Sequence, residues 1–349
     1  MQQFGRILTE DGVVPVMFDR NQPLDLRTLV SDITPDVIAS GALADVDTAH
    51  LSAVDGSVTY VAPIDGIRQV AATGFNYRKH IAEFNMNPPG EPEVFLKAIG
   101  SLCGPFDPVL RGPNPQAKLD WETELAIVIS REARDVSADE AETYIFGYVC
   151  LNDVSDRATQ VDDEGLQHLV RAKSRPTYCP IGPYLTTGVD AMNLEVWTKL
   201  NGQFEQQGNT SDMLFGIAEM VAYFSTHMTL LPGDLLATGT PPGVGFGKNR
   251  YMMCSSAASL ISAPSDTRSA LSETRRPGSS EILHAAWHTK STKIQRDTGI
   301  VKDIPYRIEK RTLPLLHVLQ VASRQSAVLP FELVRPILGG AESAPQTIG

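Results

Sequence analysis

Short runs in which apolar residues alternate with polar ones, or follow one another without a break, dominate the first 250 residues. The runs FGRIL, VVPVMF, QVAATGF, ELAIVIS, IFGYVCLNDV and LLATGT predict strands, and Pro/Gly turns separate many of them. Apolar residues at helical spacing predict helices in ADEAETYIF, in the Leu/Ala-rich stretch 25–51 and in TSDMLFGIAEMVAYFSTHM. The last of these has a stripe that is expected in the core: Met213, Ile217, Met220, Val221 and Phe224. The pattern predicts an α+β fold, mainly β.

The predicted strand LDWETELAIVI, residues 119–129, carries acidic residues at its start. Because strand side chains alternate, Asp120, Glu122 and Glu124 are expected on one face, with Trp121 and Thr123 on the other. Like charges at that spacing repel one another. Either this face is open to water, or a positive group lies between the acids.

A further acid follows another predicted strand, because Asp153 comes after the apolar run that ends at Leu151. Two strand ends placed together would bring the carboxylates of Glu122, Glu124 and Asp153 around one cation. Oxygen ligands of this kind suit Mg²⁺, Mn²⁺ or Ca²⁺. Taken from the residues alone, a solvated strand edge remains the alternative.

Composition narrows the classes of partner and the compartment. The net charge of -11 and the pI of about 5.1 argue against nucleic acid or an anionic membrane as a partner. The four cysteines show no C-x-x-C spacing, which favours reduced thiols in a cytoplasm. We therefore expect a soluble, cytoplasmic protein, since the N-terminus lacks a leader pattern and no run approaches the roughly 20 apolar residues of a membrane span.

The composition changes beyond Arg250. Residues 251–349 contain 12 Lys+Arg and 8 Asp+Glu, and nine serines lie between Ser255 and Ser280. Apolar residues there recur with neither helical nor strand spacing. This segment is therefore expected to pack poorly beyond about residue 252.

The order and spacing of seven motifs between Gly74 and Asn249 resemble the fumarylacetoacetate hydrolase family. The motifs are GFNYRKHIAEF, PEVFLKAIGSLCGP, DWETELAIVI, GYVCLNDVSDRATQ, AKSRPTYCPIGP, NGQFEQQGNTSDM and PGDLLATGTPPGVG. The resemblance implies a mixed β-roll catalytic domain over 66–250, a small β-rich N-terminal domain over 1–65, and an atypical tail over 251–349.

The same resemblance implies roles for individual residues. It implies a metal, Mg²⁺ or Mn²⁺ with Ca²⁺ as a further candidate, held by Glu122, Glu124 and Asp153. It also implies that the substrate is faced by Gln160 and Lys173 and that its carboxylate is bound by the turn Thr238, Gly239 and Thr240. Lys173 and the metal would stabilise an enolate formed from the substrate.

His80 and Glu83 lie three residues apart, which on a helical turn places them on one face. A carboxylate beside an imidazole fixes its tautomer and stabilises the charged form that arises when it takes a proton from water. The pair resembles the base dyad that smaller hydrolases of the family carry on a mobile lid.

The activity that the resemblance implies is metal-dependent hydrolysis of a C–C bond in an acylpyruvate-like or 2,4-dioxo acid, by a homodimer. The alternatives are an isomerase, decarboxylase or lyase acting on a related 2-oxo dioic acid, and an inactive metal-binding or interaction protein. A panel of 2-oxo acids assayed with and without metal discriminates among them.

Two features depart from the family. Arg175 and Pro176 stand where Phe and Asp are frequent, and Ala158 stands where Asp is usual, which affects the expected substrate more than the metal. The C-terminal sequence with which members of the family normally continue is also missing after Arg250. Back-translation of 261–268 in a shifted frame gives a sequence similar to that ending, which indicates a frameshift near residue 252; a genuine extra domain is the competing interpretation.

Overall fold

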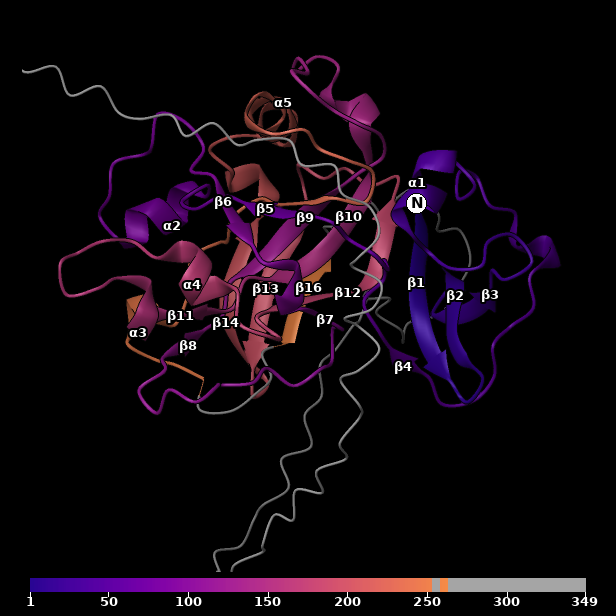
Figure 1. Ribbon diagram of the computed structural model, residues 1–349, viewed down its shortest axis with the longest axis horizontal. Helices are drawn as coiled ribbons and strands as arrows, with labels where there is room; N and C mark the ends of the chain where they lie inside the picture. Colours follow the sequence, from indigo (N-terminus) through magenta and orange to yellow (C-terminus); the bar gives the residue numbers. More distant parts are fainter. Residues whose placement is uncertain (253–257, 263–349) are drawn as a thin grey trace, which may run out of the picture. The chain divides into compact units, whose positions relative to one another are not determined.

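The computed structural model describes residues 1–252 and 258–262 (Figure 1). The strands are β1 (Gln2–Thr9), β2 (Gly12–Asp19), β3 (Gln22–Asp25), β4 (Thr59–Tyr60), β5 (Val70–Ala72), β6 (Phe95–Lys97), β7 (Leu102–Cys103), β8 (Leu119–Asp120), β9 (Thr123–Ile129), β10 (Ile145–Asn152), β11 (Ser155–Asp156), β12 (Cys179–Thr187), β13 (Glu195–Leu200), β14 (Gln203–Asn209), β15 (Leu235–Ala237) and β16 (Ala258–Ser262). The α-helices are α1 (Pro35–Ser40), α2 (Arg78–Glu83), α3 (Arg157–Gln160), α4 (Leu169–Lys173) and α5 (Ile217–His227). The 3₁₀ turns are η1 (Thr48–His50), η2 (Ile99–Ser101), η3 (Ala141–Tyr144), η4 (Thr210–Asp212) and η5 (Phe246–Lys248).

One large mixed sheet forms the centre of the described fold. Its strands follow the order β3-β2-β1-β12-β10-β9-β15-β5-β6, with β4 paired to β1 and β7 paired to β12. Two smaller sheets pair β11 with β8, and β14 with β13 and β16. The predicted α+β fold with mainly β structure is confirmed.

The N-terminal strands continue the large sheet and do not form a sheet of their own. Strand β1 pairs with β2 on one side and with β12 on the other, where Phe4 lies opposite Leu185. Phe4 belongs to the same apolar core as Val128 of β9. A smaller apolar cluster on the other face of β1 and β2 is formed by Ile7, Val14, Val16 and Phe18.

Most predicted strands are present, whereas one predicted helix is absent and another is much shorter than predicted. The sequence ADEAETYIF forms only the turn η3 and then enters β10, because its last residues pair with β9. The stretch 25–51 contains only α1 and η1. The stripe from Met213 to Phe224 is buried as predicted, although α5 begins only at Ile217, after the N-cap Gly216.

The predicted tail lies almost entirely outside the described residues. Within it, β16 pairs with β13, with Ile261 opposite Val196. The frameshift and poor packing beyond residue 252 therefore stay predictions. In the part of the chain that the structure describes, no helix is long and apolar enough to cross a membrane.

The strand directions bring functional side chains to one edge of the large sheet. Strand β9 is antiparallel to both β10 and β15, and β15 is parallel to β5. The start of β9 therefore lies beside the ends of β10, β15 and β5. Figure 1 shows α2, α3 and α4 in this region, away from β1 to β3.

Candidate functional site

Three carboxyl groups converge where β9 begins and β10 ends. Glu124 lies opposite Leu151 in the β9–β10 register, and the N–H of Asp153 donates to the carbonyl of Glu122 at 2.8 Å. Carboxylate oxygens of Glu122, Glu124 and Asp153 all lie within 4.8 Å of one another, and the three residues are buried. The predicted grouping is therefore present, and an acid face open to water is ruled out.

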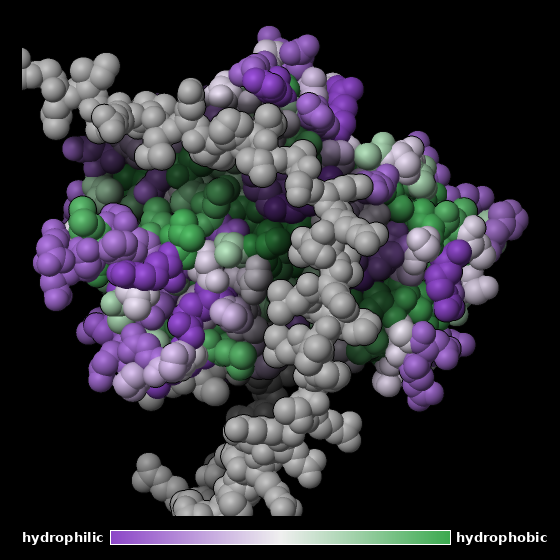
Figure 2. Space-filling view, viewed as in Figure 1, coloured by the Kyte–Doolittle hydropathy of each residue, from purple (hydrophilic) through white to green (hydrophobic). Residues whose placement is uncertain are grey.

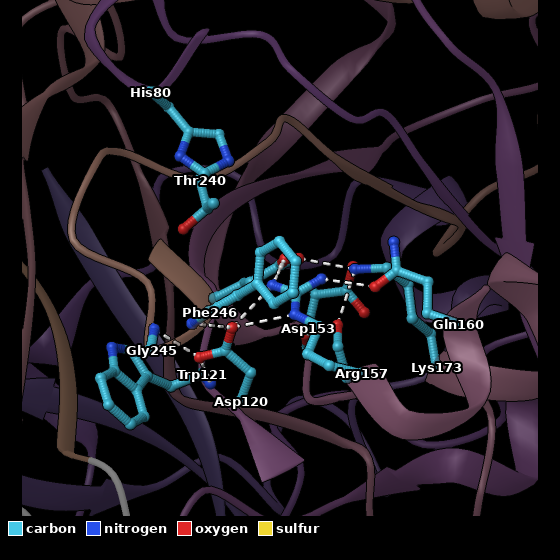
Figure 3. Close-up of polar contacts among 12 residues, drawn as sticks. His80, Asp120, Trp121, Asp153, Arg157, Gln160, Lys173, Thr240, Gly245 and Phe246 are labelled. Carbon is cyan, nitrogen blue, oxygen red and sulfur yellow. Dashed lines mark hydrogen bonds and ion pairs between the residues drawn. The ribbon is translucent and has the colours of Figure 1, made fainter. Parts of the chain in front are cut away.

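Positive side chains lie among these acids. Lys173 Nζ contacts Glu122 Oε2 at 2.6 Å and Asp153 Oδ2 at 2.7 Å, and Lys97 Nζ contacts Asp153 Oδ1 at 2.5 Å. Arg157 pairs with Glu122. The sequence led us to expect that a metal alone neutralises these acids. That expectation is incomplete, because side chains of the protein also supply positive charge (Figure 3).

The cluster still carries a carboxyl group that these cations do not balance. Burial opposes ionisation of Glu122, but Arg157 and Lys173 hold its pKa far below the ordinary value. Burial, together with Asp153 and Glu122, raises the pKa of Glu124 well above its ordinary value. A hard divalent cation would remove this penalty, because it favours oxygen ligands. The donor set therefore fits such an ion.

Asp120 has a different task from the other two acids on its face. It accepts the N–H groups of Gly245 at 2.6 Å and Phe246 at 2.9 Å, and it pairs with Arg157 at 2.9 Å. A Cβ at Gly245 would lie 2.0 Å from the carbonyl oxygen of Arg250, so the turn requires glycine. Asp120 thus fixes the loop that follows β15.

The predicted dyad forms on α2, as its spacing indicates. His80 Nδ1 lies 3.0 Å from Glu83 Oε2, and both residues are at least partly buried. Glu83 also accepts the N–H of Gly243 at 3.1 Å. Burial opposes ionisation of Glu83, but the hydrogen bonds from His80 and Gly243 lower its pKa. Glu83 therefore joins α2 to the loop that contains Gly243, as well as to His80.

Aromatic rings surround His80. Its ring stacks on Phe75 at 5.7 Å and meets the edge of Phe84 at 5.1 Å, and Phe84 stacks on Phe246 at 5.8 Å. The guanidinium of Arg157 lies 5.7 Å from the Phe246 ring centroid. Figure 2 shows hydrophobic residues at the surface in the region of α2 and α4.

A cavity of about 320 Å³ lies between α2 and the acid cluster. Its lining includes the predicted residues His80, Glu122, Glu124, Gln160, Lys173 and Thr240. Lys173 has its Nζ engaged with Glu122, Asp153 and Ser155. Figure 3 shows His80 and Thr240 apart from the contacts that Arg157 makes with Gln160 and that Lys173 makes with Asp153.

The turn after β15 makes hydrogen bonds to Glu124 of the acid cluster and to the start of β9. The N–H of Gly239 donates to Glu124 Oε2 at 2.8 Å, and Gly239 is absent from the described cavity wall. Thr240 Oγ1 donates to the carbonyl of Thr123 at 2.9 Å and accepts from Gln206 at 2.7 Å. Of the three turn residues expected to bind a substrate carboxylate, Thr238, Gly239 and Thr240, only Thr240 lines the cavity.

The sequence did not indicate all of the site. Arg157, Lys97, Asp120 and Glu93 were not assigned a role, although Arg157 and Glu93 line the cavity. Lys97 shares a strand face with the buried Phe95, but Leu96 between them is exposed, so the hydropathy of this strand gave no signal for a buried lysine. Arg175, which departs from the family, lies against Gly112 and not in the cavity wall.

Replacing Lys97 by methionine is expected to lower the free energy of unfolding by about 3–5 kcal/mol, because it leaves a buried charge on Asp153 with one partner fewer. Both side chains are fully buried, and Lys97 Nζ also donates to the carbonyl of Lys173. Urea unfolding of metal-free protein measures the change. The exposed Lys79→Met is the control, expected within about 0.5 kcal/mol of the parent protein. A loss for Lys97→Met as small as the control's would contradict this assignment.

Known proteins share this arrangement of sequence and fold. The sequence model described as "Fumarylacetoacetate (FAA) hydrolase C-terminal" matches residues 69–268, past the point where the motif resemblance ends. A 2,4-didehydro-3-deoxy-L-rhamnonate hydrolase from a Sphingomonas species is 43% identical over 227 residues, which cover 64% of this chain and 78% of the relative.

Solved structures agree with this match. A fumarylacetoacetate hydrolase from Exiguobacterium antarcticum aligns with a TM-score of 0.66 and 32% identity, over 76% of this chain and 95% of the other. A maleylpyruvate hydrolase from a Sphingobium species aligns with a TM-score of 0.62 and 27% identity, over 75% and 95%. A 5-carboxymethyl-2-hydroxymuconate delta-isomerase from Mycobacterium smegmatis aligns with a TM-score of 0.58 and 32% identity, over 75% and 94%. Because the family model matches more than half of the chain and includes both strand ends of the acid cluster, this chain belongs to the fumarylacetoacetate hydrolase family.

Proposed function

We propose that this protein hydrolyses the C–C bond between the third and fourth carbons of an acylpyruvate-like 2,4-dioxo acid. The observation that carries the proposal is one cavity lined both by Glu122 and Glu124, whose carboxylates converge with that of Asp153, and by His80, whose ring contacts Glu83. The relatives named as hydrolases support the reaction class. The products would be a carboxylic acid and a 2-oxo acid.

The proposed cofactor is Mg²⁺ or Mn²⁺, held by Glu122, Glu124 and Asp153. When bound, such an ion acts as a Lewis acid and orients an oxo acid through its oxygens. The fit rests on the oxygen-only donor set and on the raised pKa of Glu124.

His80 is the proposed general base. Nδ1 binds Glu83, which leaves Nε2 to accept a proton from a water molecule in the cavity. The water oxygen adds to the distal oxo carbon, the C–C bond breaks, and its electron pair passes to the oxo acid fragment as an enolate. The imidazolium then returns the proton to the enolate carbon.

Lys173 would stabilise the enolate through its positive charge. It would not need to donate a new hydrogen bond, since its Nζ already donates to Glu122, Asp153 and Ser155. The two carboxylates raise the pKa of Lys173 against the effect of burial, which keeps the amine charged. Gln160 and Thr240 are proposed to orient the substrate. Arg157 Nη1 donates to Gln160 Oε1 at 2.7 Å and so holds the amide in place.

Isomerisation is the second candidate, because a structural neighbour named as an isomerase shares 32% identity over 75% of this chain. Product analysis separates the two reactions. Hydrolysis releases a carboxylic acid and a 2-oxo acid in equal amounts, isomerisation leaves the mass unchanged, and decarboxylation releases CO₂.

The test is a panel of acylpyruvates, 2-oxo dioic acids and dienedioates, assayed after chelation and after addition of Mg²⁺ or Mn²⁺. Release of 2-oxo acid only with added ion is expected. Stoichiometric metal binding without any turnover would favour an inactive family member. The same preparation also tests the proposed homodimer, by sedimentation, while the proposed cytoplasmic location requires cell fractionation.

A further inference from the structure

Apolar side chains form a large part of the cavity wall: Phe75, Phe84, Met86, Phe95, Val161, Leu169 and Phe246. Three of these residues come from segments far apart in the sequence and are widely exposed, Met86 by 46%, Val161 by 45% and Phe246 by 52%. Single apolar residues scattered over a surface need no explanation, whereas several gathered at one cavity mark a site that an apolar group covers. The wall therefore has apolar surface to offer a ligand.

The apolar wall begins at the proposed base. The His80 ring stacks on Phe75 and meets the edge of Phe84, and Phe84 in turn stacks on Phe246. Ring centroids at these separations are in direct contact. The rings thus make one continuous aromatic surface, which runs from the buried His80 to the exposed Phe246.

The proposed reaction decides which part of the substrate meets this surface. The oxygens of the 2-oxo carboxylate half belong at the acid cluster, and His80 must lie beside the distal oxo carbon that water attacks. Figure 3 shows His80 apart from Asp153 and Lys173. The acyl part, which continues beyond the distal oxo carbon, therefore extends past His80 along the aromatic surface.

The charges of the wall argue against a second carboxylate on the acyl part. Among the described residues that line the cavity, Arg157 and Lys173 are the permanent cations, and each is already paired with two acids. A second carboxylate would find no unpaired cation in this wall, and it would meet the like charge of the exposed Glu93. An apolar chain avoids both penalties.

We propose that Phe84, Met86, Val161 and Phe246 form the subsite for the acyl part and select 2,4-dioxo monocarboxylates with an apolar acyl chain. This inference rests on the proposed hydrolysis and names its substrate class. The cavity volume of about 320 Å³ is at the lower end of the range of small-molecule sites, about 300–1,000 Å³, so the chain is short. Phe246, at the exposed end of the aromatic surface, is the specificity residue that can be tested most directly.

The test compares acylpyruvates that differ only in the acyl part, with enzyme loaded with Mn²⁺. Pentanoylpyruvate ends in a methyl group, glutarylpyruvate ends in a carboxylate on a chain of the same length, and acetylpyruvate lacks the chain. Pentanoylpyruvate is expected to exceed each of the others by about 10- to 100-fold in kcat/KM, because each buried methylene contributes about 0.8 kcal/mol. Equal or higher kcat/KM for glutarylpyruvate would overturn the inference.

Substitutions of Phe246 test the apolar contact itself. Phe246→Ala is expected to lower the preference for pentanoylpyruvate over acetylpyruvate by about 5-fold, since apolar surface is lost, while acetylpyruvate is cleaved as before. Phe246→Leu keeps apolar surface and should retain the preference. Both variants keep the backbone N–H that Asp120 accepts.

Phe204→Ala is the matched control. Phe204 is similarly exposed, by 48%, and its ring also lies beside a cation, Lys199, but it belongs to β14 and is outside the cavity wall. This variant should keep the substrate ratios of the parent enzyme. An equal loss of preference in Phe204→Ala and Phe246→Ala would overturn the assignment of the subsite.

The outcomes separate this inference from the proposed function. Cleavage of none of the three acylpyruvates by the parent enzyme would contradict the hydrolase itself. Cleavage with ratios that Phe246→Ala leaves unchanged would contradict the subsite alone. If Phe246→Ala instead slowed sedimentation without changing the ratios, the apolar residues would belong to a contact between copies of the chain, and the subsite would again be wrong.

Discussion

Replacing Glu124 by alanine is expected to weaken Mn²⁺ binding by more than about 100-fold and to abolish measurable turnover. Loss of a partner outside the ligand shell already costs a metal site about 10- to 100-fold, and Glu124 is a proposed ligand. It is also the acid of the cluster whose pKa is raised most clearly by burial and by its acidic neighbours. Calorimetric titration with Mn²⁺ measures the affinity.

Glu124→Gln tells a lost ligand from a damaged fold. Because the folded state raises the pKa of Glu124, its stabilising contribution is complete below the unfolded pKa and is lost as pH rises through the folded pKa. At neutral pH the uncharged glutamine should therefore leave the metal-free protein at least as stable as the parent. Only the stabilisation that Mn²⁺ adds should disappear. Parental Mn²⁺ affinity in both variants would refute the metal site.

Strands were predictable from the sequence where apolar runs are long and their partners bury both faces. Every residue of β9 is buried, and its run ELAIVI predicted it. The sequence ADEAETYIF failed because its helical period is a local preference, whereas pairing of Ile145 with Ile129 commits its end to the sheet. The run IFGYVCLNDV, which starts at Ile145, already predicted a strand there, so two local patterns conflicted and pairing with β9 decided between them.

The same distinction applies to the site. His80 and Glu83 are close in sequence, so their spacing on a helix was enough to pair them. Lys97 meets Asp153 across a separation of 56 residues, and the hydropathy of β6 points the wrong way, because Leu96 is exposed while Lys97 is buried. A buried lysine of this kind is explained only by the acid that it meets.

The three acids on one face of LDWETELAIVI show where sequence chemistry succeeded in part. Their mutual repulsion left two alternatives, a face open to water or a positive group among the acids; the face is buried, and Arg157 and Lys173 supply positive charge there. Asp120 does not belong with the other two, because it binds the backbone of the 245–246 turn. The predicted strand 119–129 is in fact two strands, β8 and β9, which belong to different sheets, so alternation along one strand could not assign a partner to each acid.

Replacing His80 by alanine is expected to lower kcat by about 10²- to 10⁴-fold, the contribution of a positioned general base. Mn²⁺ affinity should be unchanged, because His80 lies on α2 and the proposed ligands lie at the strand ends. Steady-state kinetics on the best acylpyruvate found and calorimetry with Mn²⁺ measure the two effects. Full activity in His80→Ala would move the base elsewhere in the cavity.

Glu83 has two contacts, and two substitutions separate them. Glu83→Gln removes the charge beside His80 but keeps an oxygen for the N–H of Gly243, whereas Glu83→Ala removes both. If Glu83 acts by stabilising the imidazolium, Glu83→Gln should slow turnover markedly, and combining it with His80→Ala should be little worse than His80→Ala alone. If Glu83 instead serves only to hold the Gly243 loop, Glu83→Gln should retain activity while Glu83→Ala loses it. Additive losses in the double variant would show that the two residues act independently, and the dyad would then be wrong.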